Sequence, residues 1–160
     1  MKGKEAERSI IVETVSRVMI PFIQLFSLYV IIHGASGPGG GFQGGVVFGA
    51  SFILYVVVFD ITMGRQRLPE SVNTALGSLG ISIYAGIGFL CIILSAGVAQ
   101  YLNYGFLPFT PHFEENRALS MELVEIGIGI TVMAVMVSIF FDLAWKEKKG
   151  GRGEEERDKG

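Results

Sequence analysis

Long apolar stretches dominate this chain and limit the fold that it can adopt. The runs Val18–Ile32 and Val46–Phe59 contain no charged residue, and no Lys, Arg, Asp or Glu occurs from Ser71 through Phe113. A helix of about 20 apolar residues crosses a hydrocarbon core of about 30 Å. A soluble protein would need a polar shell over such helices, and only 18% of the 160 residues are charged, against about 25% in ordinary soluble domains. The sequence therefore predicts an all-α integral membrane protein.

The apolar stretches predict four transmembrane helices within one membrane domain, residues 10–145. We expect the spans at about residues 10–32, 42–61, 71–100 and 121–145. A connector rich in aromatic residues, 101–120, precedes the fourth span, and Ser120 is the expected N-cap of that span. Residues 1–9 form a short polar N-terminus, and the charged tail 146–160 has a composition that favours disorder.

The distribution of Lys and Arg predicts the orientation in the membrane. Three of these residues lie in the N-terminal segment, Arg65 and Arg67 follow the second span, and six lie in the tail, whereas the first connection has none and the third has only Arg117. Because short cytoplasmic segments are enriched in Lys and Arg, we expect both termini in the cytoplasm. The first span resembles a signal peptide in its basic start, but its length and the charged Glu13 and Arg17 favour a retained helix.

Composition and motifs argue against several classes of function. A net charge of −2 gives no sign of nucleic-acid binding, and a single cysteine, Cys91, offers no disulfide or CxxC pair. No Cys/His cluster or nucleophile–base arrangement stands out, so we expect no metal, no cofactor and no enzyme activity of the chain alone. The spacing of Gly39, Gly41 and Gly44 fits a dinucleotide-binding pattern, but that pattern needs a βαβ unit around it.

A glycine-rich segment between the first two spans, residues 33–45, is the most distinctive part of the sequence. It contains no charged residue, and its glycines permit a tight, closely packed connection. Gly41, Gly45 and Gly49 recur every fourth residue and form a small face on which another helix can lie close. Irregular backbone near membrane depth has to be buried, so we expect the segment to pack on another part of the chain or, preferably, on a partner subunit.

Acidic residues near the ends of the spans are candidates for an ion path, because charge within a membrane is costly. The candidates, each within about two turns of a span end, are Glu13, Asp60, Glu122, Glu125 and Asp142. Of these, Glu13, Asp60 and Glu125 are preferred. Glu13 has Arg17 one turn later, a spacing that suits an ion pair within the helix. His33 at the end of the first span is interpreted as a hydrogen-bonded residue of the membrane interface, with a proton relay as the alternative.

The string Pro38-Gly39-Gly40-Gly41-Phe42-Gln43-Gly44-Gly45, preceded by His33-Gly34, resembles the MnhB/MrpB family. These are small membrane subunits of multisubunit Mrp-type Na⁺/H⁺ antiporters, and related subunits occur in archaeal membrane-bound hydrogenase complexes. The resemblance covers roughly Ile10 to Phe141. The motif residues that it carries over are His33, Gly34, Pro38, Gly39, Gly40, Gly41, Phe42, Gln43, Gly44 and Gly45, with a packing role first and a role in the ion path second.

The resemblance implies a multi-pass subunit of the plasma membrane that has no catalysis of its own. It would contact other membrane subunits and the lipid bilayer, help to assemble the complex and line the route of Na⁺ and H⁺. Two alternatives stay open. One is a small self-contained transporter with four spans, acting as a homo-oligomer through Glu13, and the other is an assembly scaffold with no part in the ion path.

Overall fold

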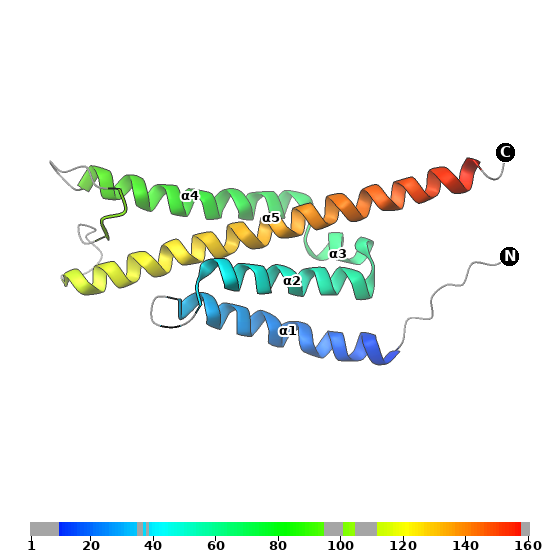
Figure 1. The fold of residues 1–160 in the computed structure, drawn as a ribbon, viewed down its shortest axis with the longest axis horizontal. Helices are drawn as coiled ribbons and strands as arrows, with labels where there is room; N and C mark the ends of the chain where they lie inside the picture. Colours follow the sequence, from blue (N-terminus) through cyan, green and yellow to red (C-terminus); the bar gives the residue numbers. More distant parts are fainter. Residues whose placement is uncertain (1–9, 35–36, 38, 95–100, 105–111, 158–160) are drawn as a thin grey trace.

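The computed structural model describes residues 10–34, 37, 39–94, 101–104 and 112–157, with backbone alone for residues 113 and 147–157. These residues form helices and no strands. The helices are α1 (Ile10–Ile32), α2 (Gly41–Phe59), α3 (Ile61–Arg67), α4 (Glu70–Leu94) and α5 (Phe113–Arg157) (Figure 1).

Four of the helices are long and apolar enough to cross a membrane: α1, α2, α4 and the part of α5 from Glu114 to Lys146. The shortest, α2, has 19 residues and covers about 28 Å at 1.5 Å per residue. The prediction of an all-α membrane protein with four spans is confirmed. The first residues of α1 and the last residues of α5 lie at the same end of the molecule (Figure 1), and the cytoplasmic placement of that end stays a prediction.

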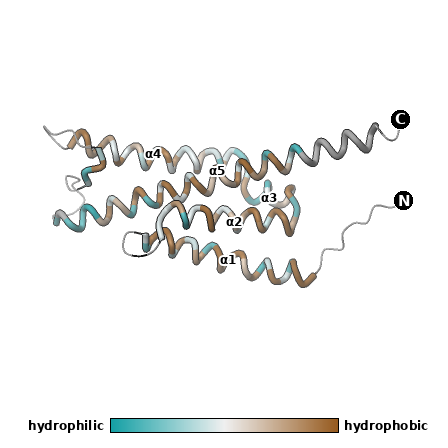
Figure 2. Tube along the Cα trace, viewed as in Figure 1, coloured by the Kyte–Doolittle hydropathy of each residue, from teal (hydrophilic) through white to brown (hydrophobic). Residues whose placement is uncertain are grey.

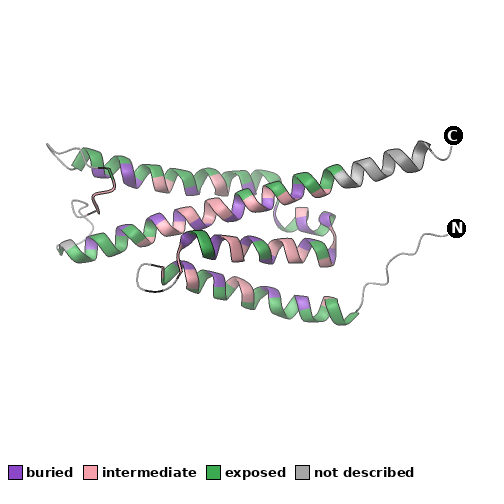
Figure 3. Cartoon of the chain, viewed as in Figure 1, coloured by how far each residue is buried: buried purple, intermediate pink, exposed green. Residues whose placement is uncertain are grey.

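The long helices lie in a row in the order α4, α5, α2, α1 (Figure 1). Helix α5 packs on both α4 and α2, and α1 packs mainly on α2. Apolar residues run along the spanning helices (Figure 2). Many of them are exposed, and much of α1 and α4 is exposed (Figure 3). Such exposed apolar faces suit lipid or other membrane subunits.

Glycines form the closest contacts along α5. A Cβ on Gly45 of α2 would lie 2.6 Å from the carbonyl oxygen of Gly129, and a Cβ on Gly49 would lie 3.4 Å from Cβ of Met136. On the other side of α5, a Cβ on Gly80 of α4 would lie 2.5 Å from the carbonyl oxygen of Gly127. Small residues let transmembrane helices approach to backbone contact, so these positions set how close α2 and α4 lie to α5.

The last helix differs from the one predicted. Helix α5 begins at Phe113, so Ser120 is not an N-cap: it lies inside the helix, where its Oγ donates to the carbonyl oxygen of Asn116 at 2.7 Å. Glu114 and Glu115 occupy the first turn, where the helix dipole favours acids. The prediction of a disordered tail is also wrong as far as Arg157, because Glu, Lys and Arg are good helix formers and extending an existing helix is easier than starting one.

The segment after α2 contains a short helix that the sequence did not suggest. Asp60 ends α2 with φ 90° and begins α3, where its carboxylate accepts from the Thr62 backbone N–H at 3.3 Å. This cap reverses the chain toward α4. Helix α4 ends at Leu94, and the predicted continuation of this span to residue 100 lies outside the described residues.

The predicted ion pair within α1 is absent from the described part of the chain. Instead, the guanidinium carbon of Arg17 lies 5.5 Å from the centre of the Phe59 ring of α2. Arg17 therefore contacts a neighbouring helix rather than Glu13, because a flat guanidinium is stabilised on an aromatic face.

Candidate functional site

Backbone hydrogen bonds hold the described residues of the turn between α1 and α2. The Gly34 N–H donates to the carbonyl oxygen of Ile31 at 3.3 Å, and the Gly37 N–H donates to that of His33 at 2.8 Å. Gly40 then has φ 153°, a conformation that residues with a Cβ rarely adopt. Its carbonyl accepts from the Gly44 N–H at 3.0 Å, which starts α2.

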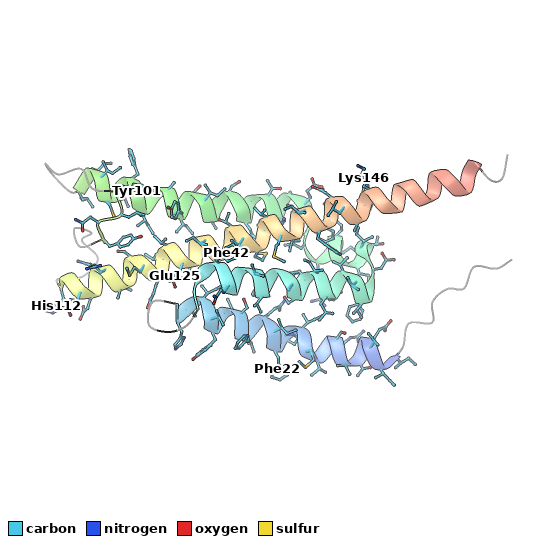
Figure 4. All side chains as sticks on the ribbon, viewed as in Figure 1. Phe22, Phe42, Tyr101, His112, Glu125 and Lys146 are labelled. Atoms are coloured by element: carbon cyan, nitrogen blue, oxygen red, sulfur yellow. The ribbon has the colours of Figure 1, made fainter. Side chains whose placement is uncertain are left out.

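Glu125 of α5 lies against this turn. A Cβ on Gly34 would overlap Oε2 of Glu125, and a Cβ on Gly41 would overlap the Glu125 carbonyl oxygen. A Cβ on Gly40 would lie 3.8 Å from Oε1. We call Gly34, Gly40 and Gly41 the glycine cradle: the missing side chain of Gly34 leaves space for the Glu125 carboxyl group, and that of Gly41 leaves space for the Glu125 backbone. Figure 4 labels Glu125 on α5, beside the start of α2.

The carboxyl group of Glu125 is only partly satisfied. Its Oε2 is buried and has no hydrogen-bond partner among the described residues. An unpaired carboxylate away from water is costly, and such a group becomes neutral by taking up a proton or stays charged beside a cation.

A second set of contacts fixes the cradle relative to α5. The buried Ser27 Oγ donates to the Gly44 carbonyl oxygen at 2.6 Å and ties α1 to the start of α2. A Cβ on Gly129 of α5 would lie 3.0 Å from Cδ1 of Ile31 and 3.2 Å from the Gly41 carbonyl oxygen. Three helices therefore meet in backbone contact directly beside Glu125.

Other motif residues lie apart from Glu125 or outside the described residues. Phe42 and Gln43 are exposed on α2, and Gly39 is placed against Val30 of α1. His33 is exposed, with Nδ1 3.2 Å from the Tyr29 carbonyl oxygen and its ring stacked on that of Tyr29. Pro38 is outside the described residues.

The structure does not bring the three predicted ion-path acids together. Glu13 lies in the first turn of α1 and Asp60 caps α3, both at the end of the molecule opposite the cradle (Figure 1). Glu125 alone lies at the glycine segment. Within the described residues no group of three His, Cys, Asp or Glu side chains could hold a metal ion.

One buried polar residue escaped the sequence reasoning. Asn73 of α4 donates through Nδ2 to the Ala134 carbonyl oxygen and to Ser138 Oγ, both at 2.8 Å. Its Oδ1 has no partner among the described residues. The sequence does show an amide side chain within an uncharged span. Such a residue indicates a hydrogen bond between helices, because buried amides in membranes commonly join helices. Asn73 joins α4 to α5 at the α3 end of the molecule.

Comparison with known proteins places the chain in a family. Residues 11–138 match the family described as "Domain related to MnhB subunit of Na+/H+ antiporter". The relatives named antiporter subunit mnhB2 include that of Staphylococcus haemolyticus, which is 28% identical over 86% of this chain and 96% of its own length. The Staphylococcus epidermidis RP62A protein is 29% identical, and the Staphylococcus aureus Newman protein 26%, each over 91% of this chain and 98% of its own length. The resemblance seen in the glycine motif is therefore confirmed, and the chain belongs to the family of MnhB-related subunits of Na⁺/H⁺ antiporters.

Proposed function

We propose that this chain works in a multisubunit Na⁺/H⁺ antiporter of the plasma membrane as a non-enzymatic subunit that lines the ion route, with Glu125 as a carboxyl group that exchanges protons. Family membership and the names of the relatives support the antiporter subunit. One observation carries the more specific role: Glu125 Oε2 is buried without a hydrogen-bond partner among the described residues, next to glycines whose missing side chains make its space.

The other two acids have surroundings that favour a structural role. The carboxylate of Asp60 accepts hydrogen bonds from the backbone N–H and Oγ1 of Thr62, at 3.3 and 3.4 Å. Such a cap explains the residue without any ion. Glu13 lies one turn from the start of α1, where interfacial water makes a charge tolerable. Glu125 has no comparable structural explanation.

A pure scaffold is the second candidate function, and the helix contacts favour it. Gly45, Gly80 and Gly129 all lie at backbone contacts between helices, which suits a subunit that holds others in place. A scaffold explains the glycines but leaves the unpaired carboxyl group of Glu125 without a purpose, since an alanine or glutamine would cost less to bury. The self-contained transporter is not favoured, because the relatives are named as antiporter subunits.

The proposal also concerns the complex in which this chain works. The names of the relatives favour a free-standing antiporter, whereas a hydrogenase-type complex was the other host that the motif suggested. Affinity purification of the tagged chain from its own cells, followed by mass spectrometry, decides between them. Recovery of hydrogenase subunits in equal amounts would overturn the free-standing antiporter.

Substitution of Glu125 by Gln tests the proposed role in transport. This change keeps the size of the side chain and removes the exchangeable proton, so we expect assembly to persist while Na⁺-driven proton movement falls about tenfold or more, equivalent to about 1.4 kcal/mol in the barrier. The assay uses inverted membrane vesicles that contain the assembled complex, with a pH-sensitive dye as the readout.

Two further variants complete this experiment. Glu122→Gln is the matched control, because Glu122 lies about one turn earlier on the same helix and is half-buried, and it should transport at nearly the normal rate. Glu125→Asp retains the carboxyl group and should keep part of the activity. Transport by assembled Glu125→Gln at the rate of the unmodified complex would leave the scaffold as the better description.

A further inference from the structure

We propose that a pocket between α1, α2 and α3 binds one acidic phospholipid, with the phosphate at Arg17 and Arg67 and an acyl chain along the apolar wall. The pocket has a volume of about 460 Å³, within the range of about 300–1,000 Å³ that is usual for ligand sites. We call it the arginine pocket. It is separate from the glycine cradle, so this site stands or falls independently of the role of Glu125.

Two adjacent aromatic rings hold the two cations at the pocket. The guanidinium carbon of Arg17 lies 5.5 Å from the centre of the Phe59 ring, and that of Arg67 lies 5.1 Å from the centre of the Tyr55 ring. The two ring centres are 4.8 Å apart. Arginines from two different helices are therefore brought to the same pocket by neighbouring rings of a third helix.

These two arginines have no ion pair within the described residues, in contrast to their neighbour Arg65. Arg65 Nη1 bonds Glu70 Oε2 at 2.7 Å, and its guanidinium lies over the Phe141 ring at 4.8 Å. The nearby acid Asp60 directs its carboxylate to the Thr62 N–H and Oγ1. Arg17 and Arg67 are thus available for an anion, and the guanidinium fork matches the oxygens of a phosphate group.

The rest of the pocket selects an amphiphile rather than a free anion. Its wall includes Ile20 and Pro21 of α1, Phe52 of α2 and Met63 of α3. A small phosphate ion would leave this apolar wall uncovered, whereas an acyl chain would cover it and make van der Waals contacts along it. An acidic segment of a partner protein is the competing occupant, and the crosslinking of Met63→Cys described below tests it.

The place of the pocket in the molecule also suits a lipid. The pocket is lined by Pro21 and Gln24 of α1, and the next residues in the sequence, Phe22 and Leu25, are exposed apolar side chains. The arginines lie toward the end of the molecule that carries α3 (Figure 1), which the distribution of Lys and Arg predicts to be cytoplasmic. Basic pockets between helices on that side of a membrane commonly hold acidic lipid headgroups.

The test uses the complete complex that contains this chain, purified in detergent and incubated with phosphatidylglycerol that carries a photoreactive group on one acyl chain. After illumination, mass spectrometry of the chain locates the attached lipid. We expect attachment within residues 20–24 and 52–63. The double variant Arg17→Gln, Arg67→Gln should reduce it about tenfold, while the matched control Arg65→Gln, which has the same chemistry on the same helix, should leave it unchanged.

Further arms separate a lipid from other occupants. A phosphatidylcholine analogue should attach weakly, and millimolar inorganic phosphate should not displace phosphatidylglycerol. Met63→Trp, which narrows the pocket from its exposed rim and leaves both arginines, should also reduce attachment, so the site stays testable if the double variant fails to assemble. Equal labelling by phosphatidylcholine, full displacement by phosphate, unchanged labelling in Met63→Trp, or crosslinking of Met63→Cys to another subunit would each overturn the proposal.

Discussion

The meaning of the glycine motif depends on a single carboxyl group. Gly34, Gly40 and Gly41 lack the side chains that would otherwise meet the Glu125 carboxyl group or its backbone. Only Gly40 has a backbone conformation that itself requires glycine. Gly34 and Gly41 are needed for space, so their role is understood only when the residue that fills the space is known.

An alanine at Gly34 tests whether the cradle is built around Glu125. Its Cβ would overlap Oε2 of Glu125 and lie 2.6 Å from Cα of Gly40, so we expect the free energy of unfolding to fall by about 1–3 kcal/mol. Gly37→Ala is the matched control, since its Cβ would meet only the His33 carbonyl oxygen at 3.3 Å, with an expected change within about 0.5 kcal/mol. Thermal melts of the purified complex provide the measurement, and equal melting of the two variants would contradict this interpretation.

Part of this site can be predicted from the sequence. The glycine motif is the most distinctive segment of the chain, and Glu125 is one of the three preferred acids. The sequence alone could not join the two, because the side of α5 that faces the first connection is set by packing between distant parts of the chain. Neither hydropathy nor residue spacing predicts that Glu125 lies at the glycine segment. The cap that Asp60 forms at Thr62 could not be predicted for a similar reason, because it depends on a turn that the apolar pattern does not reveal.

At the scale of helices, close contacts at glycines set the distances between α2, α5 and α4. Gly45 on α2 and Gly80 on α4 meet Gly129 and Gly127 of α5, two residues apart on opposite sides of that helix. With no hydrophobic driving force between helices in lipid, such contacts gain their stability from close packing. The position of α5 therefore fixes both the cradle on one side and α4 on the other.

The contact between α2 and α5 predicts different effects for two glycine substitutions. Gly45→Ala would place a Cβ 2.6 Å from the Gly129 carbonyl oxygen, and since backbone cannot move aside as a side chain can, we expect a loss of about 1–3 kcal/mol. Gly86→Ala meets nothing within 4 Å and gains helix propensity of about 0.5–1 kcal/mol. Chemical or thermal unfolding of the complex should therefore show a lower stability for Gly45→Ala than for Gly86→Ala. A destabilised Gly86→Ala would contradict the open surroundings of Gly86.

The elements themselves were largely predictable, because a span needs about 20 apolar residues and such stretches are visible in the sequence. The start of α1 at Ile10 and the end of α2 before Asp60 follow directly from this pattern. What hydropathy could not locate were polar helices. Helix α3 has only seven residues and includes Gly64, so neither its length nor its composition indicates a helix. The first turns of α5 contain good helix formers such as Glu114, Glu115 and Ala118 but have no apolar stretch.

The whole molecule is a single layer of helices with two apolar faces, and this shape explains why it belongs to a complex. Large exposed side chains occur on every spanning helix, among them Phe26, Val57, Phe89 and Ile139. The single layer that the described residues form encloses no channel, so an ion route along it would need a second wall. We expect other subunits to supply that wall near Glu125 and lipid to cover part of the opposite end at the arginine pocket.

The most direct test of this description is whether Glu125 exchanges protons in the working complex. A hydrophobic carbodiimide reacts with protonated carboxyl groups in apolar surroundings, and mass spectrometry of this chain identifies which residue is modified. We expect modification at Glu125, faster at acidic pH and accompanied by loss of Na⁺-driven proton movement, with no such modification in Glu125→Gln. An unmodified Glu125 in a complex that transports normally throughout the treatment would contradict its place in the ion route.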